Sequence, residues 1–148
     1  MGCIRELLRY LVYKQLASYG NVVDYIYEYF VHGINDPRKH GLTSRQGRSY
    51  VHRVREICFS DYARIRAILR RVYGYVKGLV PVLIVDGSKA VCKLCGKEFR
   101  FASSKCLMIA FSDHLRYSHG DYVDWIISYI IDSIRNELRG EDDDGGGS

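Results

Sequence analysis

The chain has 148 residues, 47% of them hydrophobic, which is enough to bury a core in one domain or two small ones. No run approaches the roughly 18 consecutive apolar residues needed to cross a bilayer, and the N-terminus follows a helix pattern, so we expect a soluble intracellular protein with no membrane partner. The net charge is +5 at pH 7, and five cysteines are an odd number, which favours a metal site over a framework of disulfides.

Charge is segregated along the chain. Between Arg38 and Lys77 there are eleven Lys or Arg residues against two acidic residues, a local sum of +9. From Ser118 to Ser148 there are eight acidic residues against two arginines, a sum of −6. This asymmetry predicts a face that binds a polyanion and an acidic end. Arginines that are only solvated on helix surfaces would give the same count.

Two amphipathic helices are predicted at the N-terminus. Residues 3–17 and 21–32 carry apolar side chains at spacings of three and four, which is typical of helices with one buried face. A glycine follows each segment, and residues 34–42 form a loop rich in turn residues.

Two basic helices are predicted next. Thr43 or Ser44 is expected to cap a helix at residues 44–58, and Ser60 a helix at residues 61–75. Each has one apolar stripe, and arginines crowd the rest of its surface. The side chains expected to contact phosphates or guanine edges are Arg45, Arg48, Arg64, Arg66, Arg70 and Arg71.

The pattern changes to strands after residue 79. Residues 80–92 contain two short β-branched runs around Asp86 and Gly87, which predicts a hairpin. Residues 121–138 then form a helix with a broad isoleucine-rich face, and the acidic, glycine-rich end is expected to be disordered. The expected organisation is a basic helical domain at residues 1–79, a hairpin with a metal site at 80–120, an amphipathic helix at 121–139 and a tail at 140–148.

Two cysteines and two histidines have the spacing of a closed metal site. Two residues separate Cys92 from Cys95, and four separate His114 from His119, near the expected end of a helix. Thiolate and imidazole suit zinc, and four such ligands leave no open position for a catalytic water. The pattern therefore predicts one structural Zn²⁺. A redox role for the cysteine pair would need a context of alternating strands and helices, which the sequence lacks.

This segment resembles the two-cysteine, two-histidine zinc finger, which implies a ββα fold. The resemblance covers residues 92–119: the four ligands match, and Phe99 and Phe111 match the two small-core positions. One departure is the gap from the second cysteine to the first histidine, which is eighteen residues where the family has about twelve. We expect the extra residues to lengthen the second strand or its link to the helix, so base-reading residues cannot be carried over.

The order of the elements is similar to that of winged helix-turn-helix DNA-binding domains. Residues 44–58 and 61–75 would be the helix pair, the second entering the major groove, and the hairpin at 80–92 would be the wing. The expected fold class is mainly α with a small β-hairpin: a winged-helix-like N-terminal part, a ββα zinc finger and a C-terminal helix. Small size, arginine bias and a single finger also resemble regulators of crenarchaea and their viruses, a thermophilic source.

Two functions follow from these patterns. The first is a DNA-binding protein and transcriptional regulator, which is not an enzyme because no phosphate loop, nucleophile elbow or carboxylate pair stands out. A metal nuclease using Asp113 with the two histidines would need an open metal position. The second is a protein-interaction module, or a homodimer, that uses the apolar face of residues 121–138, unless that face covers the finger and hairpin.

The three remaining cysteines are expected to be small buried residues. A disulfide among them is the alternative in a thermophilic protein. These residues are Cys3, Cys58 and Cys106.

Overall fold

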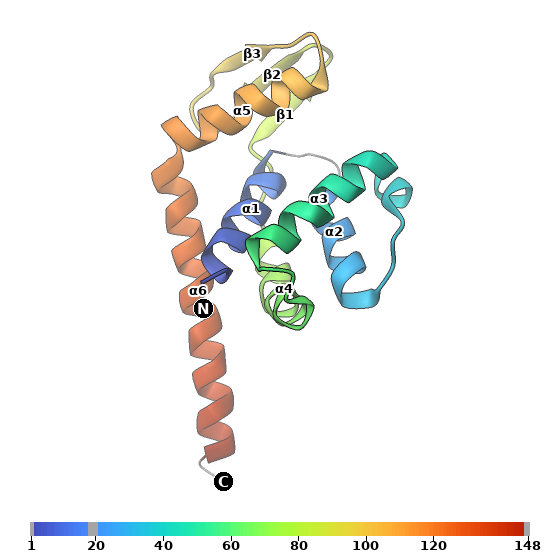
Figure 1. Ribbon diagram of the computed structural model, residues 1–148. Helices are drawn as coiled ribbons and strands as arrows, with labels where there is room; N and C mark the ends of the chain where they lie inside the picture. The colour runs from blue at the N-terminus through green and yellow to red at the C-terminus, as the bar shows by residue number, and fades with distance from the viewer. Residues whose placement is uncertain (1, 18–20, 147–148) are drawn as a thin grey trace.

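The computed structural model describes residues 2–17 and 21–146, with side chains described as far as residue 136. The prediction of a mainly helical fold with a small antiparallel sheet is confirmed (Figure 1). The elements are α1 (Ile4–Leu16), α2 (Val22–Tyr27), the π-helical turn η1 (Glu28–His32), the 3-10 turn η2 (Pro37–His40), α3 (Ser44–Ile57), α4 (Tyr62–Lys77), β1 (Leu83–Asp86), β2 (Lys89–Cys92), β3 (Glu98–Arg100), α5 (Ser104–Ser118) and α6 (Gly120–Gly146).

Helices α1 to α4 and α6 form the larger part of the molecule, with the sheet and α5 at one end (Figure 1). Within the described residues, none of the helices combines the length and apolar character that a membrane span requires. Helix α4 packs against α1, α2, η1 and α6, so it lies at the centre of the helical part. Its buried side chains are Ile65, Ile68, Leu69, Val72 and Val76.

The isoleucine-rich face of α6 is part of this core. Ile126, Ile127 and Ile130 are at most 4% exposed, and α6 lies against α1, α4 and α5. Burying one such side chain stabilises a fold by about 1.5–3 kcal/mol. The face therefore packs on the finger helix α5, as one expectation from the sequence had it, and also on α1 and α4 of the helical part. Helix α6 extends to Gly146, into the segment predicted to be disordered.

Helices α3 and α4 meet at a short turn with unusual backbone. The Thr43 side chain caps α3 in a capping box with Gln46. The expected cap of α4 is wrong by one residue, because Asp61 accepts the hydrogen bond from the backbone N–H three residues on, at 3.1 Å. Phe59 and Ser60 both have positive φ, at 54° and 56°, whereas an N-cap residue normally has extended backbone.

A disulfide joins Cys3 to Cys58, with a Cα–Cα distance of 5.1 Å. It connects the start of α1 to the residue that ends α3, across 55 residues of sequence. Both cysteines are buried, and the structure contains the disulfide that the sequence offered only as an alternative. Cys106 is exposed on α5, so the prediction that it is buried is wrong.

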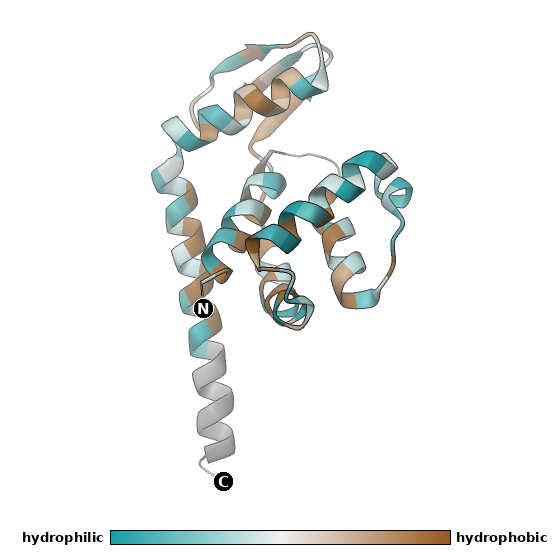
Figure 2. Cartoon of the chain, in the orientation of Figure 1, coloured by the Kyte–Doolittle hydropathy of each residue, from teal (hydrophilic) through white to brown (hydrophobic). Residues whose placement is uncertain are grey.

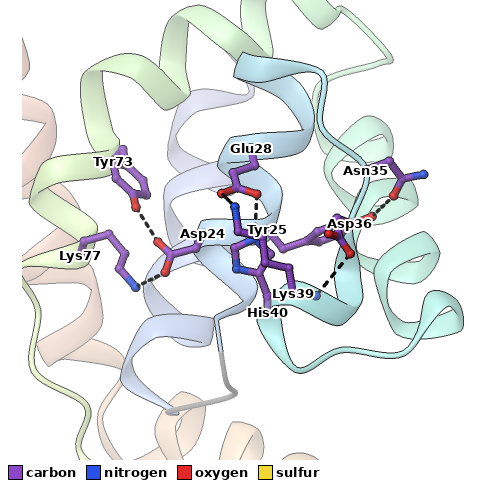
Figure 3. Close-up of polar contacts among 9 residues, drawn as sticks. All are labelled: Asp24, Tyr25, Glu28, Asn35, Asp36, Lys39, His40, Tyr73 and Lys77. Atoms are coloured by element: carbon purple, nitrogen blue, oxygen red, sulfur yellow. Dashed lines mark hydrogen bonds and ion pairs between the residues drawn. The ribbon is translucent and has the colours of Figure 1, made fainter.

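A polar network fixes α2 against α4 and the π-helical turn η1 against η2 (Figure 3). Tyr73 of α4 donates a hydrogen bond to Asp24, and Lys77 forms an ion pair with the same carboxylate at 3.2 Å. On the other side of the turn, Glu28 lies 2.8 Å from the ring of His40. The hydrogen bond from His40 is the main reason why the pKa of Glu28 is below its usual value. These contacts position the loop that leads into α3.

The sheet has the order β1-β2-β3, and both pairs are antiparallel. Asp86 pairs with Lys89, so Gly87 and Ser88 form the turn, and Gly87 has a φ of +63° that favours glycine. Strand β2 belongs to the predicted hairpin and also begins the ββα unit of β2, β3 and α5. The hairpin is therefore built into the sheet of this unit (Figure 1).

Candidate metal centre

The four predicted metal ligands come together from two ends of the ββα unit. Cys92 is the last residue of β2 and Cys95 lies in the turn that follows it. His114 lies in α5, and His119 is the residue that ends this helix. One ligand atom from each side chain lies within 4.8 Å of all the others, close enough to hold one metal ion.

The individual distances describe a compact shell. The Nε2 atoms of His114 and His119 are 3.2 Å apart. The Cys95 sulfur is 3.3 Å from Nε2 of His114, and the Cys92 sulfur is 3.7 Å from Nε2 of His119. Both imidazoles thus direct the same nitrogen toward the two sulfurs. Among the described residues, this is the one group of histidine, cysteine and carboxylate side chains that meets the geometry of a metal site.

The turn between β2 and β3 directs backbone groups at the first cysteine. Gly96 has a φ of +77°, and its N–H donates to the carbonyl of Cys92 at 2.7 Å. Burial raises the pKa of the Cys92 thiol, and hydrogen bonds from the backbone N–H groups of Leu94 and Cys95 oppose that rise. These N–H groups would stabilise a thiolate, which is the form that binds metal.

His114 is held by two aromatic rings. It is 7% exposed, and its ring centroid lies 5.2 Å from that of Phe99 and 5.9 Å from that of Phe111. Burial, followed by the charges of His119 and Lys97, lowers the pKa of His114. The neutral imidazole is the form that binds a metal, so this environment suits a ligand.

The two predicted core phenylalanines form the packing under the site. Their rings meet edge to face at 5.8 Å, and Phe111 is fully buried. The extra residues were expected to lengthen the second strand or its link to the helix, and this expectation is wrong. Strand β3 and its link to α5 have only three residues each, so the additional length lies in the N-terminal half of α5. Ser103 caps that helix by accepting a hydrogen bond from the backbone N–H of Cys106 at 3.3 Å.

The six predicted nucleic-acid arginines lie on two helices with different surroundings. Arg45 and Arg48 are exposed on α3, in a row with His52 and Arg55 at spacings of three and four. Figure 2 shows α3 as a mainly hydrophilic helix. On α4, Arg70 lies near the centre of the exposed face. Arg66 lies on one side of it, and Arg64 and Arg71 lie on the other. Of those three, Arg64 is exposed and Arg66 and Arg71 are half-buried.

A second set of cations was missed by the sequence reasoning. Arg9 and Lys14 of α1, Arg53 of α3 and Arg116 of α5 line one hollow of about 340 Å³. No local spacing indicates this group, because its members lie on three separate helices and meet only in the fold.

Comparisons with protein families, with curated proteins and with solved structures return no match to this chain.

Proposed function

We propose that the four-ligand cluster binds one structural zinc ion. Zinc with usual bond lengths in a tetrahedral site requires about 3.3 Å between two nitrogens and about 3.6 Å between a nitrogen and a sulfur. In this structure the two histidine nitrogens are 3.2 Å apart, and the two nitrogen–sulfur distances are 3.3 Å and 3.7 Å. Four protein ligands close the shell, which supports a structural metal and leaves no place for a catalytic water.

We further propose that the protein binds duplex DNA through its basic helices and acts as a transcriptional regulator. The observation that carries this proposal is the exposed row of Arg45, Arg48 and Arg55 along α3, in a segment whose local charge sum is +9. Phosphate contacts of this kind supply most of the affinity of DNA-binding proteins. Arg64 and Arg70 are the exposed arginines of α4 that would join them. Such cations position a protein on a duplex, and base contacts then give specificity.

Replacing Arg45 and Arg48 together with alanine is expected to weaken binding to a labelled random duplex by at least about tenfold at low salt. Two lost phosphate contacts should also reduce the slope of log K against log salt by about two units. Fluorescence anisotropy at several salt concentrations measures both quantities. The melting temperature should change little, because both side chains are exposed.

The matched control replaces Arg100 and Arg135, two exposed arginines on β3 and α6. It removes the same charge from other surfaces and should keep the duplex affinity within about twofold, since distant exposed charges are largely screened. Equal affinity of the α3 variant and the wild-type protein would place the duplex-binding face elsewhere.

The second candidate function is a zinc-stabilised protein-interaction module. The isoleucine face of α6, from which the sequence suggested this function, is buried within the chain. What favours it now is the pair of Trp125 and Tyr129, which are 68% and 58% exposed and stacked with ring centroids 6.0 Å apart. Large exposed aromatic side chains are enriched in protein interfaces. Bound zinc without any salt-dependent DNA binding would favour this function, with a second copy of the chain as one partner to test.

A further inference from the structure

A continuous groove runs between α5 and the helical part. The hollow of about 340 Å³ lined by Arg9 and Arg116 shares Tyr10, Lys14 and Arg53 with a second hollow of about 590 Å³. That second hollow shares its lining with a third, of about 350 Å³, which reaches the sheet. The residues common to the second and third hollows are Gln46, Tyr50, Ser104 and Met108.

The lengthened half of α5 forms one wall of this groove. Ser104, Lys105 and Met108 all line the second hollow, opposite residues of α1 and α3. They belong to the part of the helix that departs from the spacing of the zinc-finger family. The inserted residues therefore line a concave surface that lies between α5 and the helical part.

The positive charge of the groove is concentrated in the first hollow, whereas the third hollow has no charged side chain in its lining. Its first hollow has four cationic side chains, Arg9, Lys14, Arg53 and Arg116, against one carboxylate, Glu6, which leaves a charge of +3. The neighbouring hollow adds Lys105 and a single carboxylate.

Acidic residues around the groove compensate little of this charge. The carboxylate of the second hollow, Glu56, lies 3.2 Å from the ring of His52, and more than half of its side chain is exposed to solvent, which screens its charge. Asp124 contacts Arg9 at 3.5 Å, but more than half of its side chain is exposed, and such surface pairs contribute little. Like charges held together in one hollow repel each other, and a bound anion relieves that repulsion.

Lys14 forms the middle of the groove wall. Its ammonium group lies 5.3 Å from the ring centroids of both Tyr10 and Tyr50. Burial lowers the pKa of Lys14, so an anion in the groove would stabilise its charged form. Tyr13 and Arg116 line the first hollow together; burial raises the pKa of the half-buried Tyr13, and the charge of Arg116 opposes that rise.

We propose that this groove binds the phosphodiester backbone of a single-stranded nucleic acid. A hollow of a few hundred Å³ has the size of a site for single nucleotides, whereas a duplex requires a more open surface. A basic groove beside aromatic rings is the arrangement that proteins use to follow a single strand. The inference rests on the proposed function in expecting a nucleic acid. Its cations, Arg9, Lys14, Arg53 and Arg116, are not those of the α3 row, although His52 borders both surfaces.

The test is fluorescence anisotropy of a short labelled oligothymidylate with the zinc-loaded full chain. Changing Arg53 and Arg116 to glutamate should weaken single-strand binding by about tenfold or more, because two attractive contacts become repulsive. The control changes Arg100 and Arg135 to glutamate, with the same change in net charge, and should bind within about twofold of wild type. Zinc content and melting temperature of each variant show that it is folded.

Separate outcomes distinguish this inference from the duplex proposal. The groove variant should keep most of its duplex affinity, and the α3 variant, Arg45→Ala with Arg48→Ala, should keep its single-strand affinity. If the groove variant, Arg53→Glu with Arg116→Glu, binds the single strand as tightly as the wild-type protein, the inference is overturned and the duplex proposal stays intact. Displacement of the oligonucleotide by inorganic phosphate at an equal phosphate concentration would show a site for small phosphate ligands and also overturn it. Weak competition by phosphate supports the single-strand assignment.

Discussion

Replacing Cys95 with alanine is expected to remove the bound zinc and to unfold the sheet together with α5. The side chain is exposed, so the substitution removes little packing of its own. The ββα unit has a small aromatic core, and zinc supplies about 10–16 kcal/mol of apparent binding free energy in finger peptides. Elemental analysis should find well under one zinc per chain. Hydrogen exchange should show lost protection from residue 83 to residue 118, with α1 to α4 retained.

His114→Ala should give the same result through the other half of the ligand set. The matched control is Cys106→Ala, which removes an exposed cysteine of α5 that is not a ligand. This control should keep a full zinc equivalent and the wild-type melting temperature. A full equivalent of zinc in the Cys95 or His114 variant would contradict the ligand assignment.

Reduction of the Cys3–Cys58 disulfide is expected to lower the stability of the helical part by about 4 kcal/mol, from the chain entropy of a loop of this length. For a chain of this size, that corresponds to a fall of about 10 °C in melting temperature. Reduction leaves every other contact of α1 and α3 in place, so it isolates the crosslink better than a substitution at either buried cysteine. Thermal unfolding with and without a phosphine reductant, in excess zinc, measures the difference.

The control for this experiment is a variant with both cysteines replaced by alanine, which should melt at the same temperature with and without reductant. Thiol titration of the unfolded wild-type chain, with zinc chelated, should find three free thiols from the five cysteines. Five thiols in the untreated protein would show that the disulfide does not form.

The metal cluster and the helices could be predicted from the sequence because their signals are local. Two ligand pairs with fixed spacing identify the cluster, and Phe99 and Phe111 lie at the positions that the finger pattern gives them. Apolar residues at spacings of three and four likewise predict α1, α3 and α4 to within two residues. The capping error at Asp61 arose because Ser60 is also a good cap and only its positive φ excludes it.

What the sequence could not provide depends on contacts between distant segments. The disulfide joins residues 55 apart, and any two of the three non-ligand cysteines could have formed it. The inserted residues of α5 have a clear position in the sequence, but the surface they create appears only when α5 lies opposite α1 and α3. The isoleucine face of α6 was expected either to bind a partner or to cover the finger and hairpin. Its contacts are with α1, α4 and α5 of the same chain, and only α5 belongs to the finger.

The zinc content of the untagged wild-type protein, determined by elemental analysis after extensive dialysis, tests the central claim most directly. The four converging ligands predict one zinc ion per chain. Less than a tenth of an equivalent, in a protein whose sheet and α5 are nonetheless folded, would contradict the account.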